Sequence, residues 1–139
     1  MVRQSIVDSI VKQMQKISSA NGFYSEAGKN VYEWYSKPLG EGEYPAIIIR
    51  DVSDSALDGG TLQHTLKIEI DIAIKGKDTV WNMREVTSDV LKAFGKFEDE
   101  TNYQSTFNSS EFLTEQKDTL YGGVRLEFDV VYYTNRWEQ

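Results

Sequence analysis

The sequence feature that most constrains the fold is a stretch of fourteen residues in which side-chain character alternates at every step. Residues 61–74 carry polar side chains at nearly all odd positions, and their apolar side chains fall at even positions together with one histidine. The even set is Leu62, His64, Leu66, Ile68, Ile70, Ile72 and Ile74. Successive side chains of a β-strand point to opposite faces of its sheet. The pattern therefore predicts one long strand, with one face in the core and the other in water or against a partner.

Two other stretches have the spacing of amphipathic helices. Residues 2–18 repeat apolar side chains at steps of three and four, and Asn21-Gly22 follows as a helix stop. The second stretch begins after Asp78, a favourable N-cap residue, and continues to Phe94, where Gly95 is expected to end the helix. The stripes are Ile6, Val7, Ile10, Val11, Met14 and Ile17 in the first helix, and Val80, Met83, Thr87, Val90, Leu91 and Phe94 in the second.

The remaining segments are predicted as further strands and the loops between them. Residues 31–35 form a short aromatic strand, and the β-branched run 45–50 forms a mostly buried strand that starts at a proline. Residues 111–114 form another short strand, and residues 124–132 alternate again and form the last one. The expected loops are a polar one over 51–60, an irregular acidic one over 96–109 and a hairpin turn over 117–123.

These elements predict an α+β fold in the order α-β-β-β-α-β-β. Short connections favour one mainly antiparallel, twisted sheet of about five strands, with the two helices packed on one face. At about 150 residues per domain, the 139 residues form a single domain, 1–139. The side chains expected under the helices are Leu66, Ile68, Ile70, Ile72, Leu126, Phe128 and Val130.

Composition excludes several classes of chemistry. The chain has no cysteine and one histidine, which removes disulfide frameworks, thiolate nucleophiles, cysteine-based metal sites and two-histidine metal sites. Its net charge of −7 makes duplex nucleic acid and anionic membranes unfavourable partners. The sequence contains no run of about 18 apolar residues, the length that a membrane-spanning helix needs. The first residues lack the continuous apolar stretch of a signal peptide, so we expect synthesis and use in a cytoplasm.

A phosphate-binding loop is suggested by position but not by sequence. Gly76-Lys77 lies between a predicted strand and a predicted helix, where such a loop would lie. The motif needs an earlier glycine and a hydroxyl directly after the lysine. Asp71 and Asp78 occupy those two positions, and Asp78 would repel a phosphate. We therefore interpret the segment as a turn followed by a helix N-cap.

Three groups of ionisable residues each have a functional and a structural interpretation. His64 is either a structural histidine near the sheet edge or an interface or pH-sensitive contact. The aspartates of the 51–60 loop, Asp51, Asp54 and Asp58, are either ligands of a divalent ion or part of a solvated, partner-binding loop. The same-face pairs Glu69 with Asp71 and Glu127 with Asp129 are either hydrolytic carboxylates or, with Lys67 and Arg125, a charge-paired sheet face.

Aromatic residues gather in two clusters. The first contains Tyr32, Trp34 and Tyr35, and the second contains Tyr132, Tyr133 and Trp137. Strand alternation places Tyr35 opposite Tyr32 and Trp34, and it separates Tyr132 from Tyr133. Some large aromatic side chains are therefore expected to face outward, where they are typical of protein interfaces unless a helix end or the sheet twist covers them.

The order of elements carries a resemblance that extends over nearly the whole chain. It includes the first helix ending in Asn21-Gly22-Phe23-Tyr24, the segment Tyr44-Pro45-Ala46-Ile47-Ile48-Ile49, the long alternating strand, the 78–94 helix, residues 121–128 and the closing Tyr132-Tyr133. This arrangement resembles the tail terminator proteins of long-tailed phages, the family of phage minor tail protein U. The pattern is architectural and contains no catalytic signature.

The resemblance implies a structural virion protein rather than an enzyme. Such proteins form a hexameric ring on the head-proximal end of the tail, stop growth of the tail tube and present the surface that docks to the head. The implied partners are other copies of the chain, the tail tube protein and a head-completion or connector protein, with no cofactor, metal or membrane. DNA would pass through the ring without specific binding, which an acidic chain favours.

Two alternatives remain open. The first alternative is another head–tail connector, neck or tail-completion protein. The second is a small bacterial ligand-binding or carboxylate-dependent enzyme domain. A ring requires two complementary surfaces on each subunit. We expect the acidic segment 98–118 of one subunit to lie near the basic first helix of the next. The candidate interface residues are Arg3, Lys12, Lys16, Glu98, Asp99, Glu100, the loop residues Asp54 and Asp58, and the aromatics Tyr35 and Tyr133.

Overall fold

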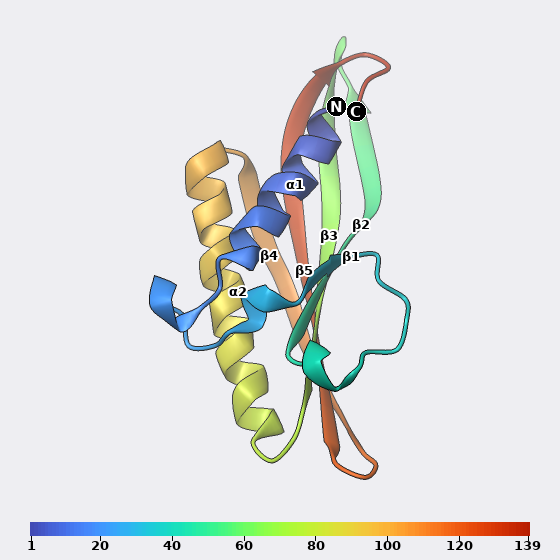
Figure 1. Cartoon of the computed structure of the whole chain (residues 1–139). Helices are drawn as coiled ribbons and strands as arrows, with labels where there is room; N and C mark the ends of the chain where they lie inside the picture. Colours follow the sequence, from blue (N-terminus) through green and yellow to red (C-terminus); the bar gives the residue numbers. More distant parts are fainter.

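A computed structural model describes all 139 residues as one sheet with two helices (Figure 1). The helices are α1 (Val2–Gln15) and α2 (Thr79–Thr101). The strands are β1 (Val31–Glu33), β2 (Ala46–Asp58), β3 (Thr61–Lys75), β4 (Gln104–Gln116) and β5 (Leu120–Asn135). Short 3-10 helices cover Ser19–Asn21, Ala27–Lys29 and Glu41–Glu43. The predicted α+β class and the order α-β-β-β-α-β-β are both confirmed.

The five strands are arranged in the order β1-β2-β3-β5-β4. All neighbours pair antiparallel except β1 and β2, which are parallel. A parallel neighbour needs a long connection, and residues 34–45 supply one between Glu33 and Ala46. β1 covers only residues 47–49 of β2, so the rest of that edge is free of it.

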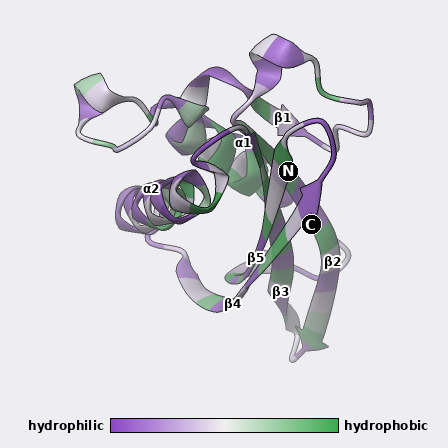
Figure 2. Cartoon of the chain, turned by 90° about the horizontal axis from the view of Figure 1, so that it is seen from below, coloured by the Kyte–Doolittle hydropathy of each residue, from purple (hydrophilic) through white to green (hydrophobic).

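Both helices lie on one face of the sheet, as predicted (Figure 2). We call this the inner face and the opposite one the outer face. The core between the helices and the sheet contains 24 buried residues. It includes all seven side chains expected there, so the register deduced from alternation in β3 and β5 is confirmed. The stacking of Phe94 on Phe128, with ring centroids 3.9 Å apart, fixes α2 over β5.

Two predicted loops are regular structure instead. Residues 51–58 continue β2 through a bulge between Asp51 and Ser53, and only the turn at Gly59-Gly60 remains of that loop. Helix α2 does not end at Gly95 but continues to Thr101, because Phe97 extends its buried stripe and Gly95 lies on the exposed side. The helix ends where Asn102 adopts a left-handed conformation, with φ of 61°.

The predicted strand over 111–114 is also longer than expected. β4 begins at Gln104 and contains a bulge between Phe107 and Ser109. Segment 96–109, predicted as irregular, is therefore the last turns of α2 followed by the first half of β4. No long loop remains in that region to serve as a binding surface.

Two neighbouring glycines give a direct test of how closely α2 approaches the sheet. A Cβ on Gly122 would lie 2.5 Å from Met83 Sδ and 2.6 Å from Thr79 Cγ2, whereas one on Gly123 would come no closer than 3.9 Å, to the Ile72 carbonyl. We expect Gly122→Ala to lower the free energy of unfolding by about 1–3 kcal/mol through overpacking.

The matched control is Gly123→Ala, which points to the outer face and should change that free energy by less than about 1 kcal/mol. Urea denaturation of both variants measures the difference. Equal stabilities for the two variants would contradict the contact between α2 and β5.

Candidate assembly interface

The most exposed part of the sheet is its β4 edge. β4 pairs with β5 on one side only, and no element covers its other side. On the inner face Phe107 and Phe112 remain 45% and 40% exposed, because α2 packs over β5 rather than over β4. On the outer face Leu113 is 69% exposed. We call these three side chains, with the free backbone edge of β4, the β4 edge surface.

Further apolar side chains are exposed near the start of α2. The first turn lies beside the start of β5, where Thr79 Oγ1 is 2.7 Å from the Gly76 carbonyl oxygen and 3.2 Å from that of Leu120. That turn presents Val80 and Trp81 to solvent. Clusters of exposed apolar side chains mark interaction sites in soluble proteins. An edge strand with free N–H and C=O groups is in addition a template for pairing with another chain.

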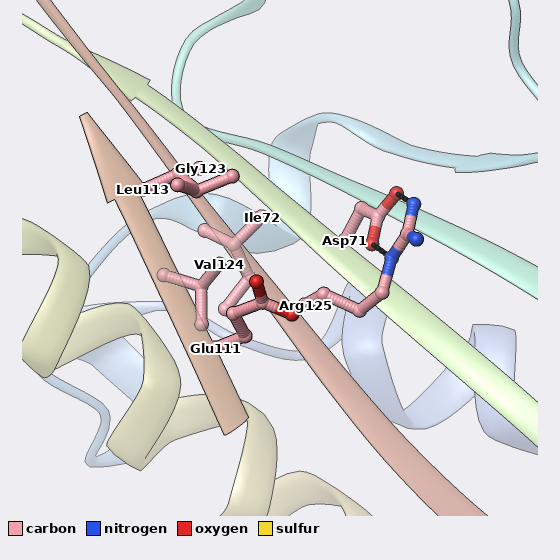
Figure 3. A pocket seen from close by; sticks show the side chains of 7 residues that line it. All are labelled: Asp71, Ile72, Glu111, Leu113, Gly123, Val124 and Arg125. Carbon is pink, nitrogen blue, oxygen red and sulfur yellow. Dashed lines mark hydrogen bonds and ion pairs between the residues drawn. The ribbon is translucent and has the colours of Figure 1, made fainter. Parts of the chain in front are cut away.

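A hollow of about 290 Å³ adjoins Leu113 on the outer face (Figure 3). Gly123 forms its floor, because it pairs with Ala73 on one side and Leu113 on the other and has no side chain of its own. Glu111 and Arg125 line it, and the Arg125 side chain extends to Asp71. The hollow is open to solvent and has both charged and apolar lining residues.

Four charged side chains of the outer face, Arg50, Glu69, Asp71 and Arg125, form one connected network. Lys67, Glu127 and Asp129, expected to share in the charge pairing, make no ion pair. Arg125 donates to the two carboxylate oxygens of Asp71 over 2.9 and 3.1 Å and lies 3.7 Å from Glu69. Arg50 contacts the same two carboxylates. The hydrogen bond to Asp71 raises the pKa of Arg125 above its ordinary value. Glu69 and Asp71, considered above as hydrolytic carboxylates, therefore each face two guanidinium groups.

His64 lies on a central strand, β3, rather than at the sheet edge, and is 2% exposed. Its Nδ1 is 2.9 Å from Asp54 Oδ1, and its Nε2 is 2.8 Å from Thr134 Oγ1. Its ring stacks on Tyr132, whose hydroxyl donates to Asp54. Burial, and then that hydrogen bond, raise the pKa of Tyr132. The distances are those of an Asp–His–hydroxyl relay, but the relay is enclosed in the sheet.

The three aspartates of the expected 51–60 loop do not converge, so they form no common ion site. Asp51 accepts from Arg3 Nε over 2.8 Å and from Trp34 Nε1 over 2.8 Å. Partial burial opposes ionisation of Asp51, but these hydrogen bonds lower its pKa overall. The Asp54 carboxylate is buried against His64, and Asp58 pairs with Arg136. The loop prediction is wrong, and the buried Asp54 carboxylate does not face a partner.

The basic and acidic candidates lie together within one chain. Lys12, Lys16 and Glu100 line a shared hollow at the ends of α1 and α2. Glu100 accepts a 2.6 Å hydrogen bond from the buried Gln13. Glu98 accepts from both the backbone and hydroxyl of Ser105, and the hydroxyl bond lowers the pKa of Glu98. Of the acidic triplet, Asp99 makes no side-chain hydrogen bond or ion pair, so it is the member free to meet a neighbour.

The two aromatic candidates differ in accessibility. Tyr35 stacks on Tyr32 with centroids 4.5 Å apart, and both hydroxyls donate to Glu43. The hydrogen bond to Glu43 raises the pKa of Tyr32 to about 12. The expected opposition of Tyr32 and Tyr35 is wrong, because β1 ends at Glu33 and Trp34 has a φ of 50°.

Tyr133 is 64% exposed on the outer face, while its neighbour Tyr132 is buried, so the expected separation of these two is confirmed. Tyr133 pairs with Gln63, which pairs in turn with Leu57 at the far end of β2. Leu57 and Tyr133 thus form a second exposed pair of large side chains, at the opposite end of the sheet from Leu113.

No family model matches the sequence, and a comparison with curated proteins finds no similar one. Neither helix combines the length and the apolar character needed to cross a membrane.

If the β4 edge surface is separate from the core, its most exposed side chain, Leu113, should contribute little to folding. We expect Leu113→Ala to lower the free energy of unfolding by less than about 1 kcal/mol. Leu126→Ala is the matched control on β5. Leu126 is fully buried, so this variant should lose about 2–5 kcal/mol. Thermal and urea denaturation test both, and a comparable loss for Leu113→Ala would contradict the assignment.

Proposed function

We propose that this protein is a structural virion component, a phage tail terminator that assembles as a ring on the end of the tail tube and offers a docking surface to the head. The observation that carries this proposal is the β4 edge surface, an unpaired strand edge with exposed apolar side chains on both faces of the sheet. An isolated monomer gains nothing from such an edge and risks aggregation through it.

A second copy of the chain is the occupant that the surfaces favour. The β4 edge surface and the Leu57–Tyr133 pair are different patches, and Leu113 and Tyr133 lie at opposite ends of the sheet. A contact between two different patches is heterologous, and repeating it generates a ring when the rotation closes. The open hollow beside Leu113 would accept an apolar or aromatic side chain of the neighbour.

Charge supports the same proposal in two ways. The outer face neutralises much of its own charge through the network of Arg50, Arg125, Glu69 and Asp71, so a neighbour can pack on it without meeting a strong single-sign field. The net charge of −7 disfavours adhesion to DNA passing through a ring. Asp99, free of partners in its own chain, is suited to set register against a basic side chain of the next subunit.

Tail tube assembly tests this function directly. Purified protein is added to growing tail tubes, and tube length and head attachment are measured with wild type and with Leu113→Glu. Wild type should stop tube growth and permit head joining, because it caps the tube end. Leu113→Glu should lose both effects, because it places a charge in the centre of the interface.

Ser88→Glu provides the control, since it adds the same charge at an exposed position of α2. It should behave as wild type. Head joining without control of tube length would favour another connector or neck protein instead. If the wild-type protein changes neither tube length nor head attachment, the proposal is refuted, whatever result the variants give.

A further inference from the structure

The open backbone edge of β4 has a regular pattern of free groups. At the hairpin end of the β4–β5 pairing, the Lys117 amide donates to the Thr119 carbonyl over 3.0 Å. The backbone groups of successive residues in an antiparallel strand point to alternate sides, so the odd positions 109–117 bond to β5. The even positions therefore direct their N–H and C=O groups away from the sheet, and these are Ser110, Phe112 and Thr114.

The usable part of this edge lies between the bulge and the hairpin. Towards the start of β4 the edge is already closed, because the Ser105 amide donates to Glu98 over 2.9 Å. The bulge between Phe107 and Ser109 follows, and after it the strand is regular. Residues 109–115 therefore form the free edge, with Phe112 at their centre and 40% exposed on the inner face.

We propose that two copies of the chain pair antiparallel through residues 109–115, about a two-fold axis at Phe112, so that their two five-stranded sheets become one. In this arrangement Phe112 faces Phe112 of the second copy, and Ser110 faces Thr114. Each hydrogen-bonded pair in an antiparallel ladder exchanges two backbone bonds, so about six bonds form across the axis. The contact is isologous and closes on itself, which leaves no further free edge at the join.

The charges of the outer face select this register. Glu111 then lies opposite Leu113 of the second copy, and Glu115 lies opposite Ser109. An axis at position 111 would place Glu111 against Glu111, and an axis at position 113 would place it against Glu115. Like charges directly opposite each other destabilise a strand pair, whereas aromatic pairs stabilise it. The register centred on Phe112 avoids the first and gains the second.

The helices leave room for the second copy. Helix α2 packs over β5 through the Phe94–Phe128 stack, and β4 extends the sheet beyond it. In the joined sheet the two β5 strands are three strand spacings apart, about 14 Å. Packed helices need about 8–10 Å between their axes, so the two α2 helices do not clash. The paired Phe112 side chains lie in the space between them.

The size of the contact makes the dimer dependent on concentration. Residues 109–115 form a small interface compared with the roughly 1,200–2,000 Å² of stable complexes. We therefore expect the dimer at high protein concentration and its dissociation on dilution, which frees the edge. The dimer occupies the edge that the proposed ring needs, so its copies must separate before they enter a ring. The pairing itself rests on the strand edge and does not require tail assembly.

Sedimentation velocity of the full chain between about 1 μM and 1 mM tests the dimer. We expect the mass of the monomer at the dilute end and that of the dimer at the concentrated end. A monomer mass throughout would overturn the proposal, and so would a direct change from monomer to hexamer. If the protein dimerises but has no effect on tail tubes, the pairing holds and the proposed function fails.

A charge on the axis tests the role of Phe112. Phe112→Lys places two ammonium groups opposite each other, so this variant should remain a monomer over the whole concentration range. Ser88→Lys adds the same charge at an exposed position of α2 and should dimerise as the wild type does. A Phe112→Lys chain that is folded, as its circular dichroism shows, but dimerises like the wild type would refute the proposed axis.

Disulfide cross-linking tests the register, and the chain suits it because it contains no cysteine. In the Phe112→Cys variant the two Cα atoms across the axis lie about 5.5 Å apart, a distance that a disulfide spans. Ser110→Cys is the matched control on the same edge and face, but its two copies lie four positions apart, about 14 Å. Mild oxidation of concentrated protein should link Phe112→Cys into covalent dimers and leave Ser110→Cys monomeric. Equal linking of both variants, or of neither, would contradict the register.

Discussion

The pairing of β3 with β5 is the interaction on which the rest of the structure depends. The two strands match over fifteen consecutive positions, from Thr61 opposite Asn135 to Lys75 opposite Tyr121. Each alternates in character, so the pairing gathers most of the apolar side chains of both strands on one face. That face must be covered to remain out of water, and the two helices cover it. A slip of one residue in either strand would turn its apolar side chains outward.

The same constraint explains why the edge of the sheet stays open. Helix α2 lies over β3 and β5, where the Phe94–Phe128 stack and the close approach at Gly122 hold it, and α1 packs beside it against β1 and β2. β4 extends the sheet beyond the reach of α2. Its inward Phe107 and Phe112 therefore remain partly exposed, and a surface suited to assembly arises beside a fully packed core.

The sequence predicts the elements that bury side chains at regular intervals. It does not predict the elements that depend on residues far away in the sequence. β3, β5 and the two helices bury one regular face each, so spacing alone reveals them. The second half of β2 is polar, and it is a strand because its backbone pairs with β3, while Asp51, Asp54 and Asp58 pair with Arg3, His64 and Arg136. No local pattern in residues 51–60 predicts those partners.

The full length of β4 is not predicted for a different reason, and the main part of the candidate interface is missed with it. Phe107 and Phe112 are five residues apart, a spacing that places them on opposite faces of a regular strand. The bulge between Phe107 and Ser109 brings both to the inner face. Of the residues proposed from charge and aromaticity, Tyr133 and Asp99 remain accessible, whereas Asp54 is enclosed and Glu98 and Glu100 are engaged within their own subunit.

Amide hydrogen exchange along β4, compared between the isolated chain and the chain assembled on tail tubes, tests the central claim most directly. In the isolated chain the amides of β4 that point away from β5 should exchange rapidly, since they have no partner strand. On assembly the same amides should become protected, together with those around Leu57 and Tyr133. Assembly that protects α1 or α2 while the β4 edge continues to exchange rapidly would contradict the account.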